Sequence, residues 1–294
     1  MKVFGMVTTA KSEHYTDVAL KTFFETTKLE RRDLFFLIDN DQTFAASKLD
    51  TYPQVNLIVN NQPLSFSSNA NQMVDMAMRY DSDLYFMNND VVFTSDWLEP
   101  LMVDRPAILS PLCNREIQYQ TNVFTTKMIM ELDDYLSNSS GLNPLVHAHR
   151  QQMSGYLKLV VLPFFCVKIP LPVLRDVGHF DEDFGKAGGE DYDYCLRALL
   201  SGYSVEFARQ SYLLHFGGKS SWAGGETREE QDRRELHFRS YFAVKWGIPL
   251  LRLILLEDPT VLDEVPGLRA EIEKGNQLAV VQALRSQNEV AIKL

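Results

Sequence analysis

Acidic side chains gather in the segment GHFDEDFGKAGGEDYDYCLRALLSGY, residues 178–203, just before an apolar run with helical spacing. Like charges repel, so the cluster lowers stability unless a cation, a hydrogen-bond network or catalysis uses it. Glu190 and Asp191 follow Gly188 and Gly189. Helix capping favours carboxylates there by about 0.3–1 kcal/mol, but it does not explain the two glycines, which suit a tight turn or a close ligand approach. A carboxylate at such a rim could act as a general base toward a hydroxyl group.

Two further carboxylates follow apolar runs that are typical of buried strands. Asp39 comes after LFFLI, and Asp90 ends LYFMNND. Ligands bind at the carboxyl ends of strands in parallel sheets. Asp90 could therefore hold a hard divalent cation together with substrate phosphates, and Asp39 could accept hydrogen bonds from a nucleotide base or ribose. Both residues could equally be ordinary turn or cap residues.

A glycine-rich stretch, FGGKSSWAGG, follows His215. Such loops move and can cover phosphates. Lys219 could neutralise a diphosphate, and Trp222 could pack over a sugar ring. The alternative is that His215 is a packed or surface histidine and that the other two are ordinary loop side chains.

The elements that must position these residues alternate in the first third of the chain. The pattern predicts strands over 2–9, 33–39, 55–59 and 83–90, with helices over 14–28 and 71–80. This alternation predicts an α/β fold with a mainly parallel sheet flanked by helices. Further along, the pattern is less regular. We expect a helix within 124–136, a polar loop over 137–158, a strand over 159–169 interrupted by Pro163, helices over 192–203 and 226–245, and two short strands, VEFA and SYLLHF.

Bulk properties narrow the class of protein. The 294 residues carry a net charge of −10, which argues against a general nucleic-acid-binding protein. Three widely spaced cysteines with no C-x-x-C pair indicate reduced thiols and no zinc knuckle. The N-terminus does not read as a signal peptide, and no run of eighteen apolar residues occurs. We therefore expect a cytoplasmic protein without a membrane span.

Five segments, in the same order and spacing, resemble the family-2 glycosyltransferases with the GT-A nucleotide-diphospho-sugar transferase fold. They are the first strand, the LIDN strand end, SSNANQMVDMAMRYDSDLYFMNNDVVFTSDWLEPL, VGHFDEDFGKAGGEDYDYCLRALLSGY, and LLHFGGKSS with the later FAVKWG. The resemblance covers about residues 2–247. It implies a catalytic domain over 1–248 and a helical C-terminal extension over 249–294, which would pack on the domain or on a partner subunit or touch a bilayer surface.

The resemblance also implies a role for each candidate residue. Asp90 and His215 match the ligands of a divalent cation, Mn²⁺ or Mg²⁺. Asp191 matches the catalytic base, and Glu190 matches its neighbour, which contacts the acceptor. The positions that match donor contacts are Thr8, Asp39 and Asn71, and the loop residues Lys219 and Trp222 fit the same role.

One departure from the family pattern lies in the metal motif. The chain has Asn88-Asn89-Asp90, with no acid at the first position. Asn88 can still bond a ribose, but the substitution removes one negative charge from the neighbourhood of the cation. We therefore expect weaker metal binding than in members with two or three acids.

The predicted function is an inverting, metal-assisted transfer of a sugar from a nucleotide-diphosphate donor to an acceptor hydroxyl. A UDP-sugar is the expected donor, with dTDP- and GDP-sugars open. The acceptor is a glycan, a lipid-linked intermediate, a polypeptide or a small molecule, and the protein could form homo-oligomers. The alternatives are a non-catalytic nucleotide- or glycan-binding module and a nucleotidyltransferase. The second should have a glycine-rich phosphate loop after the first strand, where this chain has TTAKSEHY.

Overall fold

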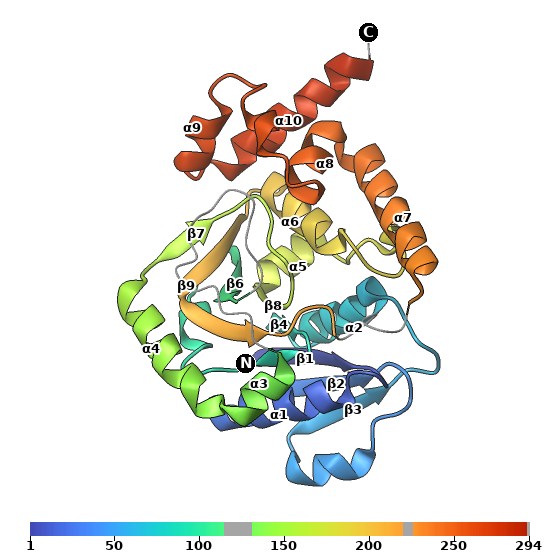
Figure 1. Ribbon diagram of the computed structural model, residues 1–294, viewed down its shortest axis with the longest axis vertical. Coiled ribbons are helices and arrows are strands. Elements are labelled where there is room, and N and C mark those ends of the chain that lie inside the picture. Colours follow the sequence, from blue (N-terminus) through green and yellow to red (C-terminus); the bar gives the residue numbers. More distant parts are fainter. Residues whose placement is uncertain (115–130, 220–225, 293–294) are drawn as a thin grey trace.

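The computed structural model describes residues 1–114, 131–219 and 226–292. Its centre is one sheet with the spatial order β3-β2-β1-β4-β8-β6-β9-β5, and β7 pairs with β9 (Figure 1). The strands are β1 (Lys2–Thr8), β2 (Leu34–Asp39), β3 (Val55–Val59), β4 (Asp83–Met87), β5 (Val91–Val92), β6 (Ala107–Cys113), β7 (Tyr156–Lys158), β8 (Cys166–Ile169) and β9 (Ser204–His215).

Helices surround this sheet. They are α1 (Glu13–Thr26), α2 (Phe66–Arg79), α3 (Leu132–Ser137), α4 (Leu142–Gln152), α5 (Leu171–Val177), α6 (Glu190–Leu200), α7 (Arg228–Trp246), α8 (Ile248–Leu255), α9 (Leu268–Glu273) and α10 (Gln277–Ile292). Short 3₁₀ turns lie at η1 (Ala46–Thr51), η2 (Glu99–Leu101), η3 (Ser139–Gly141), η4 (Glu182–Phe184) and η5 (Pro259–Leu262).

The first four strands are parallel, as the alternation predicted. In β1 and β2, Thr8 lies opposite Asp39, so the carboxyl ends of these strands meet at one edge of the sheet. Successive residues of β2 alternate between two apolar clusters, one with α1 and one with α2: Phe35 joins the first and Phe36 the second. Both faces of the sheet are therefore covered, which explains why its strands are almost continuously apolar.

The second half of the sheet is mixed. β8 runs antiparallel to both β4 and β6, whereas β6 and β9 are parallel. The two short strands predicted after residue 203 are one long strand, β9, whose register with β6 shifts between Pro111 and Leu112. The bulge at this shift keeps both halves of β9 in the same sheet.

Two other sequence predictions in this half are wrong. The expected loop over 137–158 contains α4, because Leu142, Val146 and His149 form a buried stripe at helical spacing in an otherwise polar segment. The strand expected over 159–169 begins only at β8, since Pro163 has no amide hydrogen to donate to a neighbouring strand. Of the helix expected within 124–136, residues 124–130 lie outside the described residues, and α3 begins at Leu132.

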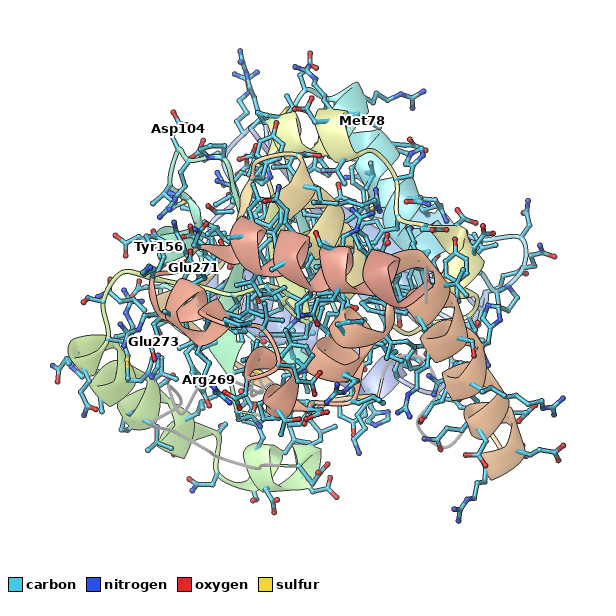
Figure 2. The ribbon with its side chains drawn as sticks, turned by 90° about the horizontal axis from the view of Figure 1, so that it is seen from above. Met78, Asp104, Tyr156, Arg269, Glu271 and Glu273 are labelled. Atoms are coloured by element: carbon cyan, nitrogen blue, oxygen red, sulfur yellow. The ribbon has the colours of Figure 1, made fainter. Side chains whose placement is uncertain are left out.

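The helices after residue 226 form a layer over α6. Thr227 and Glu230 form a reciprocal capping box at the start of α7, close to the predicted start of that helix. Figure 1 shows α7 along one side of the molecule and α8–α10 beyond α6. In Figure 2, seen from above, α8 and α10 cover the centre of the molecule. α9, which carries Arg269 and Glu273, lies to one side of them. The Gln277 side chain at the start of α10 donates to the Val205 carbonyl at 2.6 Å.

Within the residues that the structure describes, no helix is both long enough and apolar enough to cross a membrane. The division of the chain at residue 248 stays a prediction.

Candidate functional site

A cleft of about 230 Å³ opens at the carboxyl ends of β1, β2 and β4, and we call it the strand-end cleft. It is lined mainly by uncharged side chains: Val7, Thr9, Asn40, Asp41, Pro63, Leu64, Phe66, Asn69, Phe86, Asn88 and Lys186. Amide and hydroxyl groups on an apolar floor can orient a polar ligand with a flat ring through hydrogen bonds and stacking. The register of the parallel strands brings these residues together.

Asparagine side chains build one wall of this cleft. Asn60 donates to Oδ1 of Asn40 and to Oδ1 of Asn69, each at 2.8 Å. The Leu64 amide also donates to Oδ1 of Asn40 at 2.9 Å. Because these amides are buried and bonded to one another, they hold the segment before α2 in one conformation. Asn40 and Asn69 were not among the predicted site residues, although Asn40 directly follows the predicted Asp39.

Asp39 itself is buried and bonded within its own loop. Its carboxylate accepts hydrogen bonds from the backbone amides of Asp41, Thr43 and Phe44 at 3.0–3.3 Å. This is the turn-capping arrangement that the sequence left open as the alternative. Asp39 shapes the rim of the strand-end cleft through this loop, and its direct contact with a nucleotide stays a prediction.

Thr8 and Asn71 also have internal partners. Thr8 Oγ1 lies 2.7 Å from Oγ1 of Thr16 on α1. Asn71 accepts a hydrogen bond from the Phe180 amide at 2.7 Å and donates to Glu182 at 2.9 Å, which fastens α2 to the turn at η4. Neither residue is among the described residues that line the strand-end cleft.

A second cleft, of about 320 Å³, lies where α6 begins, and we call it the helix-start cleft. Aromatic and carboxylate side chains dominate its walls, which are Phe66, Asn88, Pro163, Phe164, Phe165, Gly188, Gly189, Glu190, Asp191, Tyr192, His215, Gly218, Phe238 and Leu255. Phe66 and Asn88 line both clefts, so the two adjoin. The structure thus brings four of the predicted residues, Asn88, Glu190, Asp191 and His215, to one cavity.

The turn before α6 depends on its two glycines. Gly188 and Gly189 have φ angles of +123° and +82°, in the region that favours glycine. A Cβ atom on Gly188 would lie 2.4 Å from the ring of Phe238 on α7. The close approach of α7 therefore requires glycine here, and it places Phe238 in the wall of the helix-start cleft.

Glu190 is buried at the start of α6, with 4% of its surface exposed. Its carboxylate accepts a hydrogen bond from the Gly188 amide. Burial raises the pKa of Glu190 to about 7, although the backbone amides at the helix start and the charge of Arg234 act in the opposite direction. A carboxyl with such a pKa exchanges protons near neutral pH.

Asp191 is half-buried and faces the same cavity. One of its carboxylate oxygens accepts a hydrogen bond from the Phe164 amide at 3.3 Å, and the other accepts one from the Tyr192 amide at 2.8 Å. These contacts hold the carboxylate in a defined orientation at the cavity wall. Asp193, in contrast, is fully buried and bonds Arg197, Lys245 and Trp246, so it links α6 to α7.

Asp90 and His215 lie side by side. Asp90 follows β4, His215 ends β9, and Nε2 of His215 is 3.3 Å from Oδ1 of Asp90. Asp90 is fully buried, and Oδ2 accepts a hydrogen bond from the Lys219 amide at 2.9 Å. Burial works to raise the pKa of Asp90, but His215 and the Lys219 amide outweigh it, so this pKa lies below its ordinary value. Asp90 is therefore an anion at neutral pH.

A divalent cation fits these two residues. Oδ1 of Asp90 is buried and, within the described parts of the chain, accepts no hydrogen bond. The carboxylate oxygen of Asp90 suits Mn²⁺ or Mg²⁺, whereas an imidazole is a common ligand of transition metals and is not one that Mg²⁺ prefers. Substrate phosphates and water would fill the remaining positions. Among the described residues, no group of three or more His, Cys, Asp or Glu side chains could hold a metal. Any cation would thus depend on the substrate for further ligands.

Asn114, which sequence reasoning did not select, supports this pair. Its Oδ1 accepts a hydrogen bond from the His215 amide at 2.7 Å, and its Nδ2 is buried without a partner among the described residues. The His215 ring also stacks on Phe165, with centroids 4.9 Å apart. These contacts fix the imidazole next to Asp90. Nothing in the isolated sequence marks Asn114, because it meets His215 only through the pairing of β6 with β9.

Of the two predicted loop residues, Lys219 and Trp222, the structure describes only Lys219. Lys219 forms an ion pair with Glu131 at 3.4 Å, and its amide bonds Asp90. Trp222 lies outside the described residues. Their predicted contacts with a diphosphate and a sugar stay predictions.

No protein-family model matches this chain, and no curated protein matches it. Solved structures match its fold. GalNAc-T7, in a crystal structure with UDP, GalNAc and Mn²⁺, has a TM-score of 0.56 at 14% identity over 93% of this chain and 54% of its own. This chain thus spans about half the length of the GalNAc-T7 chain.

Two other structures match over most of both chains. The mannosyltransferase PcManGT from Pyrobaculum calidifontis, in complex with GDP-Man and Mn²⁺, has a TM-score of 0.52 at 11% identity over 98% of this chain and 86% of its own. The crystal structure of S. aureus TarS residues 1–349 has a TM-score of 0.51 at 13% identity, over 100% of this chain and 92% of its own. The fold is therefore that of the GT-A nucleotide-diphospho-sugar transferases, and the predicted fold class is confirmed.

Proposed function

We propose that this chain is a glycosyltransferase that moves a sugar from a nucleoside-diphosphate donor to an acceptor hydroxyl, with inversion at the anomeric carbon. One observation carries the proposal: the strand-end cleft and the helix-start cleft adjoin at Phe66 and Asn88. A donor in the strand-end cleft would present its sugar to the helix-start cleft, which the carboxylates of Glu190 and Asp191 line. The fold supports this assignment, since matching structures hold UDP, GDP-Man or UDP-GlcNAc.

The strand-end cleft suits the nucleotide. Its amide side chains can hydrogen-bond a base and a ribose, and Phe66 offers a flat apolar surface. Asn88 lies at the junction with the other cleft and could bond the ribose or the diphosphate. A UDP-sugar is the proposed donor.

Asp90 and His215 would hold the divalent cation beside the helix-start cleft, which His215 lines. When bound, the cation would neutralise charge on the diphosphate as it leaves. Asp90 supplies a buried anionic oxygen, and His215 is held in place by Phe165 and Asn114.

Asp191 would act as the general base. The acceptor oxygen forms a bond to the anomeric carbon from the face opposite the diphosphate, the bond between that carbon and the diphosphate oxygen breaks, and the acceptor proton passes to Asp191. The Phe164 and Tyr192 amides orient the carboxylate for this step. Glu190 would hold the acceptor, and the aromatic walls would exclude water that otherwise hydrolyses the donor.

The test is to measure the release of nucleoside diphosphate from UDP-, GDP- and dTDP-sugars, with and without Mn²⁺, over a panel of acceptors. Turnover of one donor class, stimulated by Mn²⁺ and by an acceptor, is the expected result. Donor binding with no turnover under any of these conditions would contradict the proposal and favour a non-catalytic binding module.

A further inference from the structure

Lys186 lies where the two clefts meet. It stands in the turn between η4 and Gly188, and it lines the strand-end cleft. Its carbonyl accepts a hydrogen bond from the Phe66 amide at 3.1 Å, and Phe66 lines both clefts. The backbone of Lys186 is therefore fixed beside the junction, while its side chain extends toward solvent, 62% exposed.

The charges around Lys186 are unequal. Its ammonium group lies 3.2 Å from Oε1 of Glu226, whose side chain is only 7% exposed. Arg234, 11% exposed, also bonds both carboxylate oxygens of Glu226, at 3.1 and 3.3 Å. One carboxylate thus bonds two cations, although each cation also lies near a second carboxylate, Lys186 near Glu230 and Arg234 near Glu190. Since Arg234 alone can balance Glu226, Lys186 can turn toward an anion in the cleft without leaving a buried charge unpaired.

Positive charge is scarce among the described residues that line this cleft. Of its described lining residues, Lys186 carries the one cationic group, and Asp41 carries the one anionic group. The protein as a whole has a net charge of −10. In such a chain, a lysine at the mouth of a mainly uncharged cleft indicates an anionic ligand group beside it.

We infer that Lys186 binds the diphosphate of the donor. The inference rests on the proposed function and adds a residue that sequence reasoning did not select. A cation at this point stabilises the negative charge that grows on the leaving diphosphate. It also compensates for the motif Asn88-Asn89-Asp90, which offers a divalent cation one carboxylate where related motifs offer more. The contribution of Lys186 to diphosphate binding should therefore be largest without a divalent cation.

The experiment compares Lys186→Met with the wild-type protein in calorimetric titrations with UDP, GDP, uridine and guanosine, with and without Mn²⁺. Lys274→Met is the matched control, because Lys274 is similarly exposed, at 67%, and also forms an ion pair, with Glu271. We expect Lys186→Met to weaken binding of the preferred diphosphate about tenfold or more without Mn²⁺, and less with it, while nucleoside binding is unchanged. Lys186→Arg should restore most of the affinity.

Two outcomes would overturn the inference alone. Equal loss for nucleoside and diphosphate would mean that the substitution distorts the cleft. Unchanged diphosphate affinity in a wild-type protein that binds the diphosphate would exclude Lys186 alone and leave the proposed function intact. Failure of wild-type protein to bind UDP or GDP at all would instead count against the proposed function and this inference together.

Discussion

The two clefts differ in the side chains that line them. The strand-end cleft is formed by the register of parallel strands and lined mainly by neutral amides and apolar groups. The helix-start cleft is formed by a glycine turn and by α7, and it is lined by aromatic rings and carboxylates. The difference indicates a division of labour. Neutral amides can recognise a ligand by hydrogen bonds, whereas burial in the helix-start cleft raises the pKa of the Glu190 carboxyl to about 7, which suits proton transfer.

The largest expected effect is on the rate of sugar transfer, and it tests whether the two clefts have different functions. Asp191→Asn should lower the rate of sugar transfer by about 10²–10⁴-fold, because the acceptor proton loses its base, while the affinity for nucleoside diphosphate is unchanged. Steady-state kinetics and calorimetric titration measure the two quantities. Asp183→Asn, an exposed change in the same acidic segment, is the control and should leave both unchanged. Near-normal transfer by Asp191→Asn would remove it as the base.

The next effect tests the apolar character of the helix-start cleft. The pKa of Glu190 is raised from 4.5 to about 7, so between these values the folded state holds a proton that the unfolded state has lost. Stability from this group is complete below pH 4.5 and declines as pH rises to about 7, by roughly 3 kcal/mol. Denaturant titrations at several pH values should show this decline in wild-type protein and not in Glu190→Gln. Parallel pH profiles in the two proteins would contradict it.

A third change tests how the glycine turn makes the cleft. Gly188→Ala would push a methyl group into Phe238, so we expect a loss of about 2 kcal/mol in the free energy of unfolding and a further loss of transfer activity. Gly202→Ala is the matched control, because Gly202 also has a positive φ, +86°, but no atoms within 4 Å of the added Cβ. It should cost about 1 kcal/mol and leave transfer unchanged. Equal effects of the two substitutions would mean that contact with Phe238 is unimportant.

The smallest effect concerns the proposed cation ligand His215. His215→Ala should reduce the stimulation of donor binding by Mn²⁺ about tenfold, since Asp90 would lose its companion ligand. His149→Ala is the control, because His149 is similarly buried but bonds the Arg209 carbonyl on a different part of β9. Titration of donor affinity against Mn²⁺ concentration measures both. An unchanged metal dependence in His215→Ala would make His215 a packing residue.

The first half of the fold could be predicted from the sequence, because local patterns determine it. Apolar runs that end in Asp39 and Asn88 mark buried parallel strands, and the helices between them have clear apolar periodicity. α4 was missed since its buried stripe is only three residues in a polar segment. β9 was divided in two because its exposed bulge resembles a turn.

The sequence indicated candidate residues where polar or charged side chains stand out beside apolar strands or glycine runs, as at Asn88, His215 and the pair Glu190 and Asp191. Glu190 and Asp191 stand out through their charge and the preceding glycines, and the structure places both in the helix-start cleft. Asn114, Asn69 and Lys186 were missed because their importance comes from contacts with His215, Asn40 and Phe66, which are distant in the sequence. Sequence reasoning selected Asn71 and not Asn69. Asn71 links α2 to Phe180, whereas Asn69 lines the strand-end cleft.

A crystal structure of the protein with its preferred nucleoside diphosphate and Mn²⁺ tests the central claim most directly. We expect the nucleotide in the strand-end cleft beside Asn40 and Asn69, its diphosphate at Asn88, and anomalous scattering from Mn²⁺ in contact with Asp90 and His215. A nucleotide bound elsewhere, or Mn²⁺ held away from Asp90, would contradict it.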